Sequence, residues 1–118
     1  MAHGQVLVVD DDDDARVSVV EFLEQAQVSV VTARNGRDAL DMLRRGTRPA
    51  LILLDLHMPV MDGWELARIV TSDPHLRELP ICIVSGADPS DGIPSQVVAV
   101  LRKPMQMTAL LAVVYQHC

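Results

Sequence analysis

The chain has 118 residues, 49% of them apolar, which is enough for one domain with a full hydrophobic core. Its formal net charge of −6 argues against a general nucleic-acid-binding or anionic-membrane surface. No apolar stretch approaches the ~20 residues of a membrane span, and the N-terminus lacks the basic and apolar regions of a secretory signal. The two distant cysteines favour a reducing compartment. We therefore expect a single cytoplasmic domain over residues 1–118.

The first half of the chain contains three predicted strands and two predicted helices. Residues 5–9 form a short β-branched run that ends at acids, and residues 13–27 follow with apolar side chains at helical spacing. Residues 28–32 form the second predicted strand. Asn35 caps a predicted helix over residues 36–45, with Gly46 after its end. Residues 50–54 are continuously apolar, which is typical of a strand buried on both faces.

The second half continues the same alternation. Helices are predicted over residues 64–72 and 107–116, and strands over residues 81–85 and 99–102. Between the last two strands, the segment Ala87–Gln96 contains Pro89, Gly92 and Pro94. Proline costs ~3 kcal/mol in a helix interior and glycine ~1 kcal/mol, so we expect the helix between these strands to be shortened or absent. Repeated β-α units with apolar strands predict an α/β fold, a parallel sheet with helices on both faces.

Chemically active side chains follow four of the predicted strands. Asp10 and Asp11 follow the first strand, Asp55 the third, Ser85 ends the fourth, and Lys103 follows the fifth. Because ligands of such sheets bind at the carboxyl ends of the strands, we expect these side chains to converge on one edge.

This set of residues suits metal-assisted phosphoryl transfer. Neighbouring carboxylates repel one another, and a hard divalent cation such as Mg²⁺ removes that cost. Asp10 and Asp11 form a pair suited to holding the metal, whereas Asp55 stands alone and could act as a nucleophile that forms an acyl phosphate. Lys103 offers a point charge and Ser85 a hydroxyl donor to phosphate oxygens. The chemistry requires positioning and charge neutralisation more than covalent machinery.

Four stretches in this order give the chain a resemblance to a known family. They are VLVVDDD (residues 6–12), LILLDLHMPVMDG (51–63), IVSGAD (83–88) and LRKPM (101–105). The chain resembles a response-regulator receiver domain of bacterial two-component signalling, the CheY-like family, over nearly its whole length. This resemblance implies a flavodoxin-like, doubly wound sheet of five strands in the order 2-1-3-4-5.

The resemblance also implies roles for individual residues. Asp55 would accept a phosphoryl group from a phosphohistidine on a histidine kinase or phosphotransfer protein. Asp11 would bind Mg²⁺ directly, Asp10 through water, and the main-chain carbonyl of His57 would be a further ligand. Ser85 would take the place of the switch hydroxyl and Lys103 that of the phosphate-contacting lysine. The domain would switch a docking surface for a downstream protein, with no separate substrate, and would bind neither nucleic acid nor membrane.

One position departs from the family pattern. An aromatic residue usually stands three positions before the lysine and moves together with the switch hydroxyl. Val100 occupies that place here and has no ring, so we expect a different coupling to the output.

Alternative functions differ in specific residues. A pseudo-receiver, a protein-interaction module that does not use phosphate, would fit the short helix and Val100, but not the retained acids, Ser85 and Lys103. An aspartyl-phosphate phosphatase of the haloacid-dehalogenase kind usually has a second acid two residues after its nucleophile, where this chain has His57. A flavodoxin-like cofactor site would repel phosphate at Asp10–Asp14 unless a metal intervened. The acids Asp13 and Asp14 are explained by the dipole of the helix they begin. A stand-alone regulator and a receiver within a larger protein both remain compatible with the sequence.

Overall fold

The computed structural model describes residues 4–55, 63–85, 96–103 and 105–118. These residues form a five-stranded parallel sheet with four helices. The elements in chain order are β1 (Val6–Val9), α1 (Asp13–Gln25), β2 (Val30–Ala33), α2 (Gly36–Arg44), β3 (Leu51–Asp55), α3 (Gly63–Ser72), β4 (Ile81–Ser85), β5 (Val97–Arg102) and α4 (Met107–His117). The strand order is β2-β1-β3-β4-β5 and every neighbouring pair is parallel. This confirms the predicted flavodoxin-like architecture. The sequence predicts a shortened or absent helix over residues 87–96. Of these residues the structure describes only Gln96, so this prediction lies outside the described residues.

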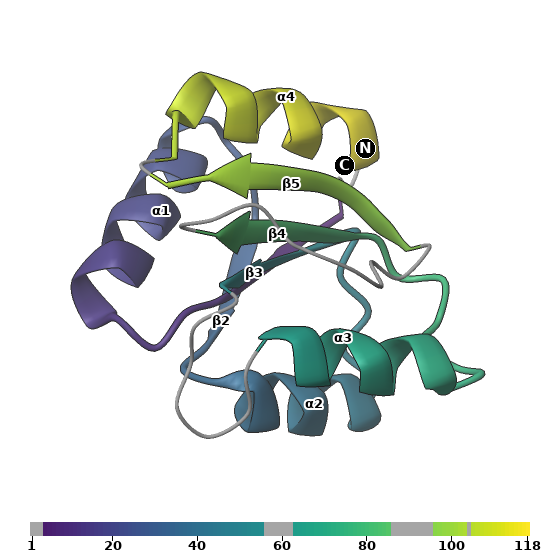
Figure 1. Cartoon of the computed structure of the whole chain (residues 1–118). Helices are drawn as coiled ribbons and strands as arrows, with labels where there is room; N and C mark the ends of the chain where they lie inside the picture. Colours follow the sequence, from purple (N-terminus) through teal and green to yellow (C-terminus); the bar gives the residue numbers. More distant parts are fainter. Residues whose placement is uncertain (1–3, 56–62, 86–95, 104) are drawn as a thin grey trace.

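The sheet lies between two layers of helices, α1 and α4 on one face and α2 and α3 on the other (Figure 1). Successive strand residues point to opposite faces, so β1 contributes Leu7 and Val9 to one core cluster and Val6 and Val8 to the other. All four side chains are buried. Burial on both faces explains why the strand is a continuous apolar run.

Helix α1 ends earlier than the sequence predicted, and β2 begins later. Gln27 adopts a left-handed conformation with φ of 65°. Its N–H donates to the carbonyl of Glu24, and the N–H of Val28 donates to that of Leu23, each at 2.9 Å. This is the Schellman arrangement that closes a helix C-terminus, and Val28 and Leu23 share one core cluster, as that motif favours. Val28 therefore belongs to the helix end, and the strand starts at Val30.

Strand β5 also differs from its predicted bounds. It starts at Val97 instead of Ala99, and its register with β4 shifts, because Ile81 pairs with Val97 whereas Cys82 pairs with Ala99. Val98 is the extra residue of this β-bulge and is 43% exposed. The remaining elements differ from their predicted bounds by at most one residue at either end, and β3 includes Asp55 as its last residue.

Local features around α2 and the cysteines agree with the sequence predictions. The Asn35 side chain accepts a hydrogen bond from the N–H of Asp38 at 2.8 Å, and Gly46 has a φ of 109° after the helix end. Both cysteines are free thiols. Cys82 is fully buried, and burial raises the pKa of its thiol to about 12.

Removing a buried side chain from α1 tests how much the core contributes. Leu23 is fully buried, whereas Val17 on the same helix is 51% exposed. We expect Leu23→Ala to lower the free energy of unfolding by about 2–5 kcal/mol through lost transfer energy and a cavity. Val17→Ala should change it by less than about 0.5 kcal/mol. Urea unfolding measures both, and equal effects would contradict the assigned packing.

Candidate metal centre

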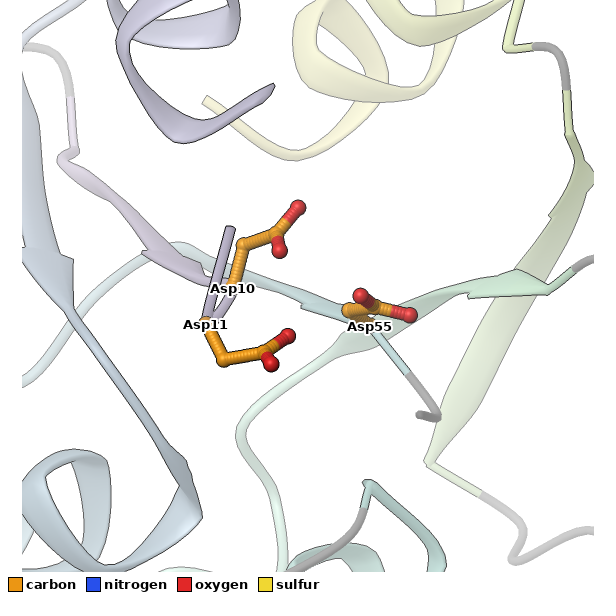
Figure 2. A group of neighbouring side chains, drawn as sticks. All are labelled: Asp10, Asp11 and Asp55. Atoms are coloured by element: carbon orange, nitrogen blue, oxygen red, sulfur yellow. The ribbon is translucent and has the colours of Figure 1, made fainter. Parts of the chain in front are cut away.

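Three carboxylates meet at the carboxyl edge of the central strands (Figure 2). Val9 of β1 pairs in register with Leu54 of β3, so Asp10 and Asp55, the next residues of their chains, lie at the same level. Asp10, Asp11 and Asp55 each offer a carboxylate oxygen, and these oxygens lie within 4.8 Å of one another. Asp55 is buried, Asp10 is half-buried and Asp11 is exposed. The cluster is therefore buried at Asp55 and open to solvent at Asp11.

The acidic segment after β1 is fixed by hydrogen bonds to its main chain. The Asp10 N–H donates to the carbonyl of Ala33 at 3.2 Å, and the Asp12 N–H donates to Oδ1 of Asp10 at 2.9 Å. Asp12 caps α1, since its Oδ1 accepts from the N–H groups of Asp14 and Ala15 at 3.0 and 3.4 Å. Only part of the acid run thus faces the cluster, while Asp12 serves the helix.

Lys103 and Ser85 lie beside the buried carboxylate. The Nζ of Lys103 lies 3.2 Å from Oδ1 of Asp55, and the Lys103 N–H donates to the carbonyl of Ser85 at 2.8 Å. Ser85 is buried, whereas the Lys103 side chain is 43% exposed. The ends of β3, β4 and β5 therefore place an acid, a hydroxyl residue and a cation together, as the sequence predicted for this edge.

The charges of this edge act on Asp10. Burial raises the pKa of the Asp10 carboxyl; the Asp12 N–H opposes that rise, the charge of Asp55 adds to it, and the Lys103 ammonium opposes it. The net effect is a pKa above the ordinary value. The carboxylate form of Asp10 is thus disfavoured in the metal-free protein, and a bound cation would relieve this.

The donor set fits a hard divalent cation. It consists of carboxylate oxygens, and the described residues of the cluster include no histidine or cysteine that would favour zinc. Mg²⁺ is commonly bound by one or two carboxylates and keeps several waters, and the exposure of Asp11 leaves room for them. His57, whose carbonyl is the predicted additional ligand, lies outside the described residues.

Two residues that hold this site were not assigned by the sequence analysis. Asp12 serves as N-cap, and Arg16 donates to the main chain of Asp10 at 2.8 Å. The N-cap could have been found from its place before an amphipathic helix. Arg16 carried no comparable signal, because an arginine in the first turn of a helix is ordinarily solvated.

The fold and the acid cluster define an α/β domain whose ligand site lies at the switch point of a parallel sheet, where the strand order reverses. The model of the response regulator receiver domain family matches residues 6–115. The chain belongs to this family, the signalling domains of two-component systems, which bind Mg²⁺ at an acidic pocket.

Individual relatives agree with this assignment. An uncharacterised 14.6 kDa protein of Leptolyngbya boryana is 35% identical over all of this chain and 92% of its own length. The sensor histidine kinase CheAY of Helicobacter pylori is 31% identical over 92% of this chain and 14% of its own length. The crystal structure of the chemotaxis protein CheY4 of Vibrio cholerae superimposes with a TM-score of 0.82 at 28% identity, covering 99% of this chain and 100% of that one. The chain spans less than half the length of several further curated relatives.

Among the described residues, no helix is both long and apolar enough to span a membrane.

Neutralising Asp10 tests the electrostatic cost of the cluster. Because its pKa is raised in the folded state, the native protein binds more protons than the unfolded chain above the ordinary pKa of 3.8. The contribution of Asp10 to stability therefore falls as pH rises from that value through the raised pKa. We expect Asp10→Asn to unfold at a higher urea concentration than wild type at pH 7 without Mg²⁺, and this gain to shrink toward pH 4. A gain that grows toward pH 4 would contradict the sign of the shift.

Proposed function

We propose that this chain is a single phosphoacceptor domain over residues 1–118, in which Asp55 receives a phosphoryl group from a phosphohistidine of a histidine kinase or phosphotransfer protein. The observation that carries the proposal is the buried Asp55 carboxylate, which shares one strand edge with two further carboxylates and a lysine 3.2 Å away. A structural acid at a strand end would not need these partners. We further propose that Asp10, Asp11, Asp55 and the carbonyl of His57 bind Mg²⁺. We also propose that the protein acts in the cytoplasm.

The reaction exchanges one bond to phosphorus for another. A carboxylate oxygen of Asp55 attacks the phosphorus atom, an O–P bond forms, and the N–P bond of the phosphohistidine breaks. The other ring nitrogen of the phosphohistidine carries a proton, so the imidazole that takes back the bond electrons leaves as the neutral base. Bound Mg²⁺ supplies positive charge to the phosphoryl oxygens.

The side chains around Asp55 match the needs of this transfer. The Lys103 ammonium already contacts the attacking carboxylate. It can therefore pair with an oxygen of the incoming phosphoryl group and neutralise part of its charge. Ser85 is the hydroxyl residue at the neighbouring strand end, and it can donate to a second oxygen. The chain thus positions the phosphoryl group and neutralises its charge, and it needs no second substrate site.

Phosphorylation would act on a surface that docks a downstream protein. Lys103 and Ser85 join the ends of β4 and β5, so a new phosphoryl group at Asp55 would alter the attachment of β5. Val100 is partly buried against the core of the α2–α3 face, without the aromatic ring that is usual in the family. We therefore propose that the output depends on the β4–β5 ends themselves, and that the chain acts without binding nucleic acid or membrane.

Intact mass after incubation with acetyl phosphate tests the phosphoacceptor. We expect wild-type protein to gain one phosphoryl group in a Mg²⁺-dependent manner. Asp55→Asn should gain none, because its amide cannot form the acyl phosphate, while an Asp41→Asn control on the exposed face of α2 should behave as wild type.

Folded wild-type protein that gains no mass, either from acetyl phosphate or from phosphorylated histidine kinases, would contradict the proposal. That outcome would instead favour the pseudo-receiver, which acts by protein contact alone.

Lys103 gives a second test. We expect Lys103→Met to slow phosphorylation of Asp55 by roughly a hundredfold, the usual effect of removing a preorganised donor to developing charge. Mg²⁺ binding should be retained, because the variant removes a positive charge beside the three carboxylates. Stopped-flow measurement follows Mg²⁺ binding and phosphorylation of Asp55 separately. Arg77→Met, which removes an exposed charge after α3, is the matched control, and an equal loss in both variants would contradict the role of Lys103.

A further inference from the structure

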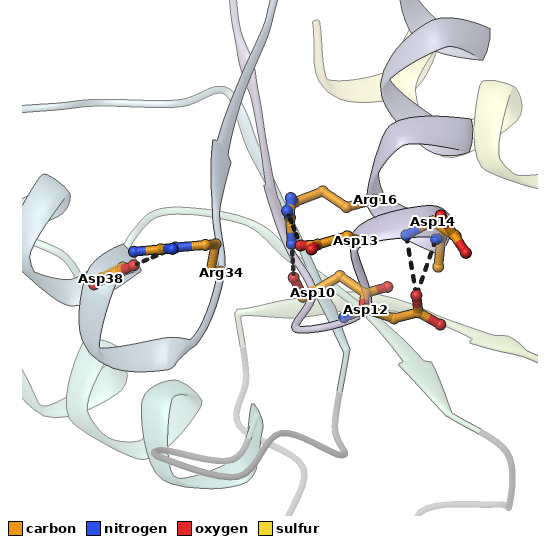
Figure 3. A network of polar contacts seen from close by, with 8 residues as sticks. Asp10, Asp12, Asp13, Asp14, Arg16, Arg34 and Asp38 are labelled. Carbon is orange, nitrogen blue, oxygen red and sulfur yellow. Dashed lines mark hydrogen bonds and ion pairs between the residues drawn. The ribbon is translucent and has the colours of Figure 1, made fainter.

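The guanidinium of Arg16 reaches back from the first turn of α1 to the acidic segment that precedes the helix. Its Nη1 donates to the main-chain carbonyl oxygen of Asp10 at 2.8 Å, and its Nη2 pairs with Oδ1 of Asp13 (Figure 3). The Arg16 side chain is only 13% exposed, although arginine is ordinarily among the most exposed residue types. A main-chain carbonyl and a carboxylate therefore both hold this guanidinium.

The carbonyl that Arg16 contacts belongs to the peptide bond between Asp10 and Asp11. Because a peptide unit is planar, fixing its oxygen also fixes the direction in which the Cα of Asp11 lies. Asp10 is held at its N–H by Ala33 and at its side chain by the N–H of Asp12. Arg16 supplies a third attachment, at the carbonyl of the peptide bond that joins Asp10 to Asp11.

We propose that Arg16 is a positioning residue for the metal ligands Asp10 and Asp11. Five consecutive aspartates repel one another and would separate if their main chain were free to move. Arg16 opposes this by holding Asp10 and Asp13 to the same guanidinium. The inference rests on the proposed function in so far as these acids bind Mg²⁺, whereas the attachment itself belongs to the metal-free chain.

Removing Arg16 distinguishes positioning from simple electrostatics, because the two effects have opposite signs. The guanidinium is a positive charge beside a cation site, so its loss should tighten Mg²⁺ binding if charge alone matters. If Arg16 positions the acids, its loss should weaken Mg²⁺ binding, as the loss of groups that orient metal ligands does.

Calorimetric titration of Mg²⁺ into Arg16→Met and Arg34→Met provides the comparison. Arg34→Met removes the same charge, but the Arg34 side chain is 76% exposed and forms an ion pair with Asp38 on α2, at 3.7 Å. We expect Arg16→Met to weaken Mg²⁺ binding by roughly tenfold and Arg34→Met to change it by less than about twofold, as screening predicts for an exposed charge. Binding to Arg16→Met that equals or exceeds that of wild type would overturn the proposal.

Arg16→Lys serves as the conservative variant and as the substitute if Arg16→Met does not fold. Its ammonium can donate to the Asp10 carbonyl, but it lacks the fork that joins Asp10 to Asp13. We expect it to recover part of the affinity that Arg16→Met loses. If Arg16→Met is unfolded, a Lys variant that binds Mg²⁺ more weakly than wild type supports the proposal, and one that binds as tightly overturns it.

Amide hydrogen exchange in metal-free protein decides the inference independently of Mg²⁺. The Asp12 N–H donates to Oδ1 of Asp10, so its exchange reports whether Asp10 is held. We expect faster exchange at Asp12 in the Arg16 variants and unchanged exchange in Arg34→Met. Unchanged exchange in the Arg16 variants would overturn the positioning role. A wild-type protein that neither binds Mg²⁺ nor accepts phosphate would overturn the proposed function instead, while the exchange result would still decide the role of Arg16.

Discussion

The mutual repulsion of three carboxylates at the carboxyl edge of the sheet is the constraint on which the rest of the site depends. Asp55 is carried there by β3 and Asp10 by the end of β1, and the parallel register of these strands leaves neither acid free to withdraw. Both strands are buried on both faces, so core packing supplies the free energy that keeps like charges together. The Lys103 ammonium offsets part of this cost. Burial, and to a smaller extent the charge of Asp55, keep the pKa of Asp10 above its ordinary value.

The negative charge of three neighbouring carboxylates favours the binding of a cation at this site. A divalent cation would relieve the repulsion without movement of the strands, and a phosphoryl group on Asp55 would then meet oxygen-binding partners already in place. The same arrangement links chemistry to the fold, because Lys103 contacts Asp55 through its side chain and the Ser85 carbonyl through its N–H. A change at Asp55 therefore reaches the ends of β4 and β5 within two contacts.

Most of the fold and the site could be predicted from the sequence because their signals are local and strong. Continuous apolar runs gave the strands, and the acids after the first and third runs lie together as strand-end chemistry requires. The end of α1 was misplaced because Gln27, not glycine, takes the left-handed position. The bulge at Val98 was missed because the predicted strand began only at Ala99, and a β-branched residue gives no signal of a bulge. Arg16 was missed because the spacing of charges does not show that its guanidinium reaches the main-chain carbonyl of Asp10. The roles of the predicted site residues, His57 among them, and the length of a helix over 87–96 stay predictions.

The most direct test of the central claim is to locate a bound divalent cation in solution. Mn²⁺ broadens the NMR signals of nuclei close to it and can replace Mg²⁺ on carboxylate ligands. Substoichiometric Mn²⁺ should first broaden the amide signals of Asp10, Asp11 and Asp55, leave those of Arg45 and Thr47 beyond the end of α2 sharp, and be displaced by excess Mg²⁺. Broadening that is centred elsewhere, or that excess Mg²⁺ does not reverse, would contradict a cation site at this edge of the sheet.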